Sequence, residues 1–507
     1  MRTTRFLSVA AAVSCLGLLA AACGSDKAAE APATTAAAAT TAAAAATTAA
    51  PAAATTAAAP AAGTQKGGAE VAAIEAAAKA KPLKATGSPI VIGFQNPEGD
   101  PSGTFPEYTL ATEAAVKYIN EELGGVGADH KAGKAGRPIE LAVCKMAINP
   151  ADSQKCANEL AAKKPLAVIS SLNFFGNHFA IYKAANIPVL VGTPITALDF
   201  TSPGVYAVGG GGGCLGVHTG LAYFVTQELK KKTIAVPWAD TPPGVFCYHD
   251  LEKKPLEVLA GKTLKGADIK AEGNEFKGKI ADLKHIGVAI KPGQADLTPQ
   301  ATQVLEFKPD GIIFSAQGAD CWTFVNSIAK LGWTAAATPL VLSGACIDIA
   351  KMKEIGPAIT KGIYFMGGAS LLSPEALKGQ LKDEALTYAA KVEKYATGGK
   401  DTAGKGFATA GFTVMMQVWE ILNESVAGDP TKADGALFQK TLGDTANHHQ
   451  WGSTGLDCAG GAKLAPYVAV CNSTVTATQW DGEKFVPVKE NFSGLALIKG
   501  TELDFGK

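Results

Sequence analysis

The sequence is poor in charge of either sign and in the motifs that mark metalloenzymes. Charged residues make up 18% of the 507 residues, and 46 basic side chains balance 46 acidic ones. Because no basic excess is present to attract phosphate, the composition excludes a nucleic-acid partner. The seven histidines are scattered, without an HExxH motif, a CxxC pair or a cluster at zinc-ligand spacing. We therefore expect neither a metal site nor a cofactor.

The serine motifs of exported hydrolases are also missing. The chain has no GxSxG nucleophile elbow and no convincing SxxK motif. An exported α/β hydrolase would share the strand and helix pattern described below, but it is the weaker interpretation because no nucleophile motif accompanies that pattern. We expect a protein that is not an enzyme.

Residues 1–22 have the pattern of an export signal. Two arginines precede an apolar run of about 17 residues that ends in small side chains. Cys23 follows directly and is similar to the lipobox cysteine of bacterial lipoproteins, although the aliphatic residue usual three places earlier is here Ala20. An uncleaved membrane anchor is the alternative, since the run is at the lower limit for a spanning helix. We expect an exported chain, lipid-anchored at Cys23 on the outer face of the cytoplasmic membrane.

Residues 23–87 are predicted to form a lipid-anchored, disordered tether. Between residues 28 and 62 the chain is almost only alanine, threonine and proline. Proline and β-branched threonine interrupt the helix that alanine favours, and few larger side chains are present to be buried. As a flexible chain, this segment would span on the order of 45 Å, enough to hold a globular body away from a membrane.

Eight cysteines remain after Cys15 in the signal and Cys23 are set aside. An even number in an exported chain indicates disulfides, although many connectivities are open and one or two pairs could instead be buried free thiols. Pairing of consecutive cysteines is the simplest arrangement. It predicts the bonds Cys144–Cys156, Cys214–Cys247, Cys321–Cys346 and Cys458–Cys471.

Short apolar runs alternate with amphipathic segments from residue 89 onward. Strands are predicted at 89–94, 138–144, 166–171, 187–192, 233–238, 310–316 and 338–344, with helices at 107–123, 150–164, 178–185, 216–230, 248–260, 319–331 and 347–354. This alternation indicates βαβ units and parallel sheets. Because the rhythm restarts after a glycine run at 209–213, we predict an α/β fold of two doubly wound parallel-sheet lobes joined by a hinge. Nucleotide binding by that run is disfavoured, since it lacks the Lys-Ser/Thr of a P-loop.

Four segments carry a resemblance to a known family. They are IGFQNPEGDPSGTF at 92–105, EAAVKYINEELGGVG at 113–127, GRPIELAVC at 136–144 and NPADSQKCANELAAKKPLAVISS at 149–171. These segments resemble the type I periplasmic binding proteins of the leucine/isoleucine/valine-binding group, the solute receptors of bacterial ABC importers. The resemblance extends over residues 88–490.

The resemblance implies a two-lobed clamp with three chain crossings between the lobes. The N-terminal lobe would contain residues 88–212 and 368–451, and the C-terminal lobe residues 213–367 and 452–490, followed by a tail at 491–507. The crossings would lie at 209–213, 367–368 and 451–454, with Gly209, Gly213, Gly367 and Gly368 as hinge residues.

The same resemblance implies the partners of the protein. A small-molecule solute would be captured between the lobes of a monomer and delivered to ABC permease and ATPase subunits, while the lipid anchor contacts the membrane. A ligand-sensing or cell-wall-associated clamp without transport is the alternative, and the sequence does not separate the two.

The residues that follow strand ends are the expected ligand contacts, because solutes bind at the carboxyl ends of strands in open α/β sheets. The candidates are Asn173, Phe174, Phe175, Thr193, Thr196, Trp238, Asp240, Gln317, Asp320 and Ser343. Thr196 matches the family's threonine that bonds the ligand carboxylate, with a helix N-cap as the alternative. One of the two phenylalanines is expected to line the crevice, and Trp238 either lines it or belongs to the core.

Departures from the family's pattern bear on the ligand. Amino-acid binders of the family hold the α-ammonium with an acidic residue after a late strand, but residues 342–346 offer no carboxylate here. Asp320 and Asp240 are nearby substitutes, although Asp320 could instead cap a helix. Because burying an unpaired ammonium costs several kcal/mol, a branched-chain amino acid is disfavoured. We expect a small organic solute with apolar or aromatic surface and one or two hydrogen-bonding groups.

Overall fold

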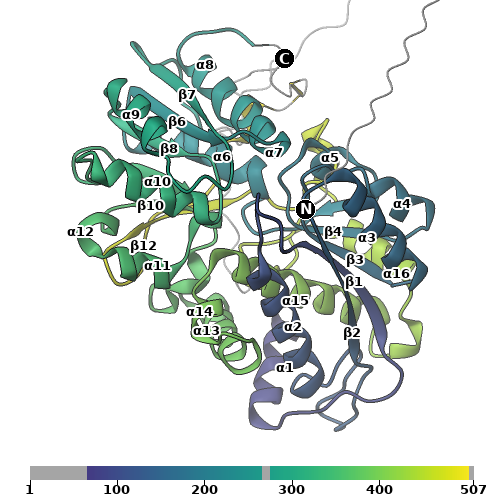
Figure 1. Ribbon diagram of the computed structural model, residues 1–507. Coiled ribbons are helices and arrows are strands. Elements are labelled where there is room, and N and C mark those ends of the chain that lie inside the picture. Colours follow the sequence, from purple (N-terminus) through teal and green to yellow (C-terminus); the bar gives the residue numbers. More distant parts are fainter. Residues whose placement is uncertain (1–64, 265–274, 499, 502–507) are drawn as a thin grey trace, which may run out of the picture. The chain divides into compact units, whose positions relative to one another are not determined.

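The computed structural model describes residues 65–264, 275–498 and 500–501, so the predicted export signal, Cys23 and most of the predicted tether lie outside the described residues. A five-stranded parallel sheet organises the first lobe (Figure 1). Its strands are β1 (Ile90–Pro97), β2 (Ile139–Met146), β3 (Ala167–Leu172), β4 (Val189–Thr193) and β5 (Val205–Ala207), in the order β2-β1-β3-β4-β5. Successive residues of β3, Val168 and Ile169, are buried in two different hydrophobic clusters, because side chains pack on both faces of the sheet.

A seven-stranded mixed sheet organises the second lobe. Its strands are β6 (Thr233–Ala239), β7 (Lys284–Ile290), β8 (Gly311–Phe314), β9 (Leu340–Ser343), β10 (Tyr364–Met366), β11 (Val475–Trp480) and β12 (Phe485–Phe492), in the order β12-β11-β10-β9-β8-β6-β7. The strands from β6 to β10 pair in parallel, whereas β11 and β12 form an antiparallel hairpin at one edge. The predicted α/β fold with two sheets is confirmed, and the hairpin is an addition to it.

Helices pack around both sheets. Those of the first lobe are α2 (Pro106–Glu121), α3 (Pro150–Ala162), α4 (Phe179–Ala184), α5 (Ala197–Thr201), α13 (Gly379–Tyr395), α14 (Lys400–Ala403), α15 (Gly406–Val426) and α16 (Gly435–Gly443). Those of the second are α6 (Gly213–Tyr223), η1 (Phe224–Glu228), α7 (Pro242–Val245), η2 (Phe246–Lys253), α8 (Lys254–Leu259), α9 (Thr298–Glu306), α10 (Ala319–Lys330), η3 (Gly344–Cys346), α11 (Ile349–Ile355) and α12 (Pro357–Thr360). Within the described ranges, no helix combines the length and the hydropathy needed to cross a membrane.

Helix α1 (Gly68–Ala80) corrects the prediction that all of residues 23–87 form a disordered tether. Its Val71 and Ala78 are buried in the first lobe. Just before the helix, the backbone N–H of Lys66 donates to Asn447 O at 3.1 Å. The alanine-rich composition of the upstream repeats continues into α1, but larger apolar side chains now allow the helix to pack. The folded body therefore already includes the chain at residue 65.

The third crossing between the sheets lies later than the resemblance implied. The N–H of Cys471 donates to Ala207 O of β5 at 3.1 Å, and Tyr467 is buried in the core of the first lobe. Because this stretch pairs its backbone with the edge strand of the first sheet, it belongs to that lobe. The crossing follows Cys471 and precedes Val475, where β11 begins, instead of lying at 451–454.

The predicted C-terminal tail at 491–507 also begins inside the fold. Strand β12 continues to Phe492, and the apolar side chains of Leu495, Leu497 and Ile498 are buried. The apolar content of this stretch explains the difference, because burying each large aliphatic side chain stabilises the folded chain by roughly 1.5 to 3 kcal/mol.

Four disulfides join the cysteines in the predicted consecutive order. They are Cys144–Cys156, Cys214–Cys247, Cys321–Cys346 and Cys458–Cys471. The predicted connectivity is confirmed, and no free-thiol pair is needed for these eight residues. The bond between Cys214 and Cys247 ties the first turn of α6 to the start of η2.

Removing the Cys214–Cys247 bond should destabilise the chain more than removing Cys458–Cys471. The two bonds close loops with sequence separations of 33 and 13 residues. Chain entropy then predicts losses of about 3.7 and about 2.9 kcal/mol for the paired cysteine-to-serine variants. Urea unfolding of the two double variants beside the wild type measures both losses, and unchanged stability in both would contradict this account.

Candidate functional site

A cavity of about 600 Å³ lies where strand ends of both sheets converge. The first sheet contributes the end of β4 at Gly192 and Thr193. The second sheet contributes Ser315, directly after β8, and Ser343 at the end of β9. Residues 450–454 and part of α15 complete the walls. The cavity thus occupies the edge at which open parallel sheets bind ligands.

The walls of the cavity carry many hydroxyl groups and little charge. Apart from the disulfide-bonded cysteines, the ionisable side chains among the described lining residues are His218, Lys378 and Glu490. Lys378 and Glu490 are exposed, whereas His218 is buried. A wall that combines hydroxyl groups with apolar side chains and carries little charge fits a small organic molecule.

The predicted hinge glycines lie where backbones approach closely. A Cβ atom at Gly209 would lie 2.1 Å from a backbone oxygen, and one at Gly213, whose φ is +54°, would lie 2.0 Å from another. Gly367 and Gly368 have φ of +73° and +70° and line the cavity together with Gly213. Any side chain at Gly209 or Gly213 would therefore displace the backbone beside the cavity.

Three of the ligand residues expected from the sequence line the cavity. They are Thr193, Gln317 and Ser343, which follow or end β4, β8 and β9. Ser343 is buried, and the other two are half-buried. Together they supply two hydroxyl groups and one amide to the wall.

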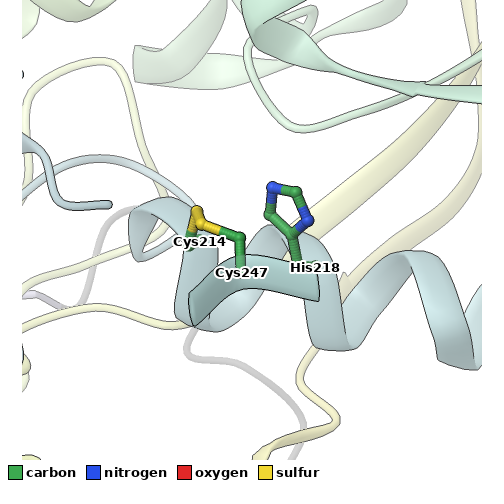
Figure 2. Close-up of side chains that lie close together, drawn as sticks. All are labelled: Cys214, His218 and Cys247. Atoms are coloured by element: carbon green, nitrogen blue, oxygen red, sulfur yellow. A yellow bond between two sulfur atoms is a disulfide. The ribbon is translucent and has the colours of Figure 1, made fainter. Parts of the chain in front are cut away.

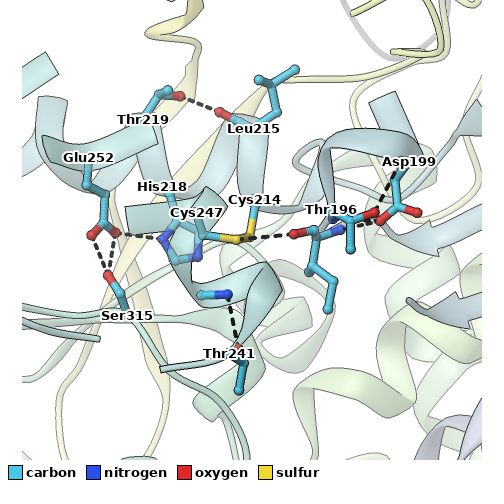
Figure 3. The surroundings of a disulfide bond; sticks show 12 residues. Thr196, Asp199, Cys214, Leu215, His218, Thr219, Thr241, Cys247, Glu252 and Ser315 are labelled. Atoms are coloured by element: carbon cyan, nitrogen blue, oxygen red, sulfur yellow. Dashed lines mark hydrogen bonds and ion pairs between the residues drawn. A yellow bond between two sulfur atoms is a disulfide. The ribbon is translucent and has the colours of Figure 1, made fainter. Parts of the chain in front are cut away.

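Thr196 and Asn173 do not line the cavity, because both bind the buried carboxylate of Asp199. Figure 3 shows Thr196 beside Asp199. Thr196 caps α5: its Oγ1 accepts from the N–H of Asp199 at 3.3 Å, and its own N–H donates to Asp199 Oδ2 at 2.8 Å. Asn173 Nδ2 donates to Asp199 Oδ1 at 2.7 Å. Burial raises the pKa of Asp199 to about 6, and these hydrogen bonds oppose the rise. The N-cap alternative for Thr196 is the correct one.

The aromatic candidates pack in the lobes and do not form the cavity wall. Phe174 is buried in the core of the first lobe, and Phe175 packs against that core. Trp238 stacks on Tyr248, with ring centroids 5.2 Å apart and an interplanar angle of 13°. Neither phenylalanine is among the residues that line the cavity, whereas the sequence predicted one of them in the crevice.

The acidic candidates also lie off the cavity wall. Asp240 is exposed, and Asp320 accepts a hydrogen bond from the N–H of Gly293 at 3.0 Å. The Asp320 carboxylate thus holds the loop before α9. Neither residue is among those that line the cavity.

Helix α6 contributes a part of the wall that the strand-end rule missed. Cys214, Val217 and His218 line the cavity, and Figure 2 shows His218 beside the disulfide from Cys214 to Cys247. The ligating atoms of these cysteines and of His218 lie within 4.8 Å of one another, as in a metal centre. Because the two sulfur atoms are bonded to each other, they offer no thiolate to a metal.

A buried ionic cluster surrounds His449, close to the cavity residue Trp451. This cluster was not predicted from the sequence. His449 Nε2 contacts Glu384 Oε1 at 2.8 Å, and its Nδ1 contacts Glu420 Oε1 at 3.0 Å. Burial lowers the pKa of His449, but the two carboxylates outweigh it and raise that pKa to about 10. Trp451 Nε1 donates to Glu75 of α1 at 3.1 Å, and burial raises the pKa of Glu75 to about 8. The cluster fastens α1 beside the cavity.

Two α/β lobes around a shared and weakly charged cavity define a two-lobed binding protein. The family model for periplasmic binding proteins matches residues 89–445, and the chain belongs to this family. The resemblance seen in the sequence is thereby confirmed. Because the family consists of extracytoplasmic binding proteins, the chain is a binding protein and not an enzyme. A search of curated proteins finds no match.

Solved structures show the same fold at low sequence identity. A leucine-binding protein of Thermotoga maritima is 15% identical, with a TM-score of 0.57 over 80% of this chain and 99% of its own. A branched-chain amino acid transporter substrate-binding protein of Streptococcus pneumoniae, in complex with isoleucine, is 14% identical, with a TM-score of 0.56 over 80% of this chain and 100% of its own. An ABC transporter solute-binding protein of R. palustris, in complex with 4-hydroxybenzoate, is 17% identical, with a TM-score of 0.57 over 80% and 97%.

Proposed function

We propose that the chain is the extracytoplasmic solute-binding receptor of an ABC importer. It captures a small organic solute between its two lobes by hinge closure and delivers it to a membrane permease. The observation that carries this proposal is the cavity of about 600 Å³ whose walls come from both sheets. A solute held there contacts both lobes, so its binding energy favours the arrangement in which the lobes meet.

The cavity walls favour a solute with an aromatic or apolar body over a branched-chain amino acid. An α-ammonium group needs a buried carboxylate, and the carboxylate in the described lining, Glu490, is exposed. The hydroxyl groups of Thr193 and Ser343 suit a polar substituent on an apolar body. By analogy, the R. palustris protein that holds 4-hydroxybenzoate supports an aromatic solute.

Isothermal titration of the purified chain, freed of bound solute, tests the ligand class. We expect an aromatic acid such as 4-hydroxybenzoate to bind with a dissociation constant on the order of micromolar, or about −8 kcal/mol. Leucine, isoleucine and valine should give no heat at the same concentrations, because the described lining buries no carboxylate for their ammonium group. Micromolar leucine binding would show this proposal of the ligand class to be wrong.

The lipid anchor at Cys23 forms part of the proposal. Cys23 follows an export signal and precedes the alanine- and threonine-rich segment. A Cys23→Ala variant should lose incorporation of a labelled fatty acid and move from the membrane to the soluble fraction, since one missing acyl anchor removes most of the membrane affinity. A wild-type chain without lipid label, together with a variant that stays in the membrane fraction, would contradict the anchor.

A further inference from the structure

Glu252 of η2 is a fully buried carboxylate that none of the interactions above explains. Its exposed fraction is 0%, and it does not line the cavity itself. Figure 3 shows its two partners: His218 Nδ1 lies 2.6 Å from Glu252 Oε1, and Ser315 Oγ donates to the same oxygen at 2.6 Å. Burying a carboxylate costs several kcal/mol unless a positive charge and hydrogen bonds compensate it. Of its two partners, His218 is the one that can carry that charge.

Glu252 reaches the cavity only through these two partners. His218 comes from α6 and Ser315 follows β8, and both line the cavity. A hydrogen bond between these groups in which the carboxylate of Glu252 is the acceptor needs a proton on His218 Nδ1. This hydrogen bond fixes the orientation of the imidazole ring. Within the described part of the chain, Nε2 of the same ring has no hydrogen-bond partner.

His218 differs from the other ionisable groups of the wall. Lys378 and Glu490 are exposed, so water screens their charges. His218 has an exposed side-chain fraction of 10%, and its carboxylate partner has 0%. A charge held at this place interacts with a solute more strongly than one at the exposed positions, because little water lies between them.

We propose that His218 determines the specificity of the cavity by donating Nε2–H to a carboxylate of the solute. The imidazole carries both ring protons, one toward Glu252 and one toward the solute, and Glu252 is a positioning residue that orients the ring and balances its charge. This inference rests on the proposed function and narrows its solute class to organic carboxylates. The acid group of the solute would then contact the second lobe, to which His218 and Glu252 belong.

Titration with benzoate and benzamide tests the inference, because the two probes share a shape and differ in charge. The wild-type chain should prefer benzoate by about ten-fold or more, the value of a charge-assisted hydrogen bond. A His218→Gln variant should lose most of that preference, because benzoate binding weakens far more than benzamide binding. A Glu252→Gln variant should reduce the preference as well, although Glu252 touches no solute.

A second histidine variant, outside the cavity, serves as the control for this titration. His285→Gln changes a half-buried histidine of β7 that does not line the cavity, and it should keep the wild-type preference. An unchanged preference in His218→Gln would overturn the inference. Equal weakening of both probes in that variant would do so too, because it indicates a structural role. Failure of the wild type to bind either probe would overturn the aromatic solute class of the proposed function and this inference with it.

Discussion

Replacing Ala345 by tryptophan should abolish solute binding while the chain stays folded. Ala345 lines the cavity directly beyond β9 and is half-buried, so an indole there occupies the space that the solute needs. We expect at least about a hundred-fold loss of affinity, equivalent to roughly 2.8 kcal/mol. Isothermal titration with the tightest-binding member of the aromatic-acid panel measures the loss, and thermal unfolding verifies that the variant is folded.

Ala350→Trp is the matched control for this substitution. Ala350 is an exposed residue of α11 in the same lobe, and it does not line the cavity. Its affinity for the solute should equal that of the wild type. Wild-type affinity in Ala345→Trp would mean that the solute binds elsewhere.

Replacing His449 by leucine should cost about 3 to 5 kcal/mol of unfolding free energy at mildly acidic pH. The imidazolium lies between the carboxylates of Glu384 and Glu420, and all three side chains are buried. Removing the cation takes away the ion-pair partner that Glu384 has in the described structure, and it leaves Glu420 with only the longer contact to His448 Nδ1 at 3.7 Å. Urea unfolding compares the variant with the wild type.

The cost of losing His449 should depend on pH in a defined direction. The pKa of His449 is raised from 6.5 to about 10 in the folded chain. Its contribution to stability is therefore complete below pH 6.5 and is lost as the pH rises toward about 10. The deficit of His449→Leu should be larger at about pH 6 than at about pH 9.5.

His130→Leu serves as the control, because the half-buried His130 contacts a backbone oxygen and no carboxylate in the described structure. Its effect on stability should be small. A His449→Leu deficit that is no larger than this control, or that is equal at both pH values, would contradict the assignment of an imidazolium to the cluster.

Several of the buried strands were predicted from apolar runs in the sequence. Residues 166–171 form one apolar run, and the structure places β3 at Ala167–Leu172 with every residue buried. Strand β7 was not predicted from the sequence; it pairs only with β6 at the edge of its sheet and mixes exposed with buried residues.

Only part of the cavity wall was predicted from the sequence. The strand-end rule places Thr193, Gln317 and Ser343 on the cavity wall, but it does not reach His218, which lies on a helix. Thr196 was misassigned because its hydroxyl group caps α5 and its N–H binds Asp199. Thr196 and Asp199 have the spacing of a capping box, so the sequence carried a signal for this competing role.

A crystal structure of the chain with the tightest-binding member of the aromatic-acid panel tests the central claim most directly. The account predicts solute density in the cavity between the end of β4 and the ends of β8 and β9, in contact with Thr193, Ser343 and His218. Solute density on the outer face of either sheet, with the cavity occupied only by water, would contradict it.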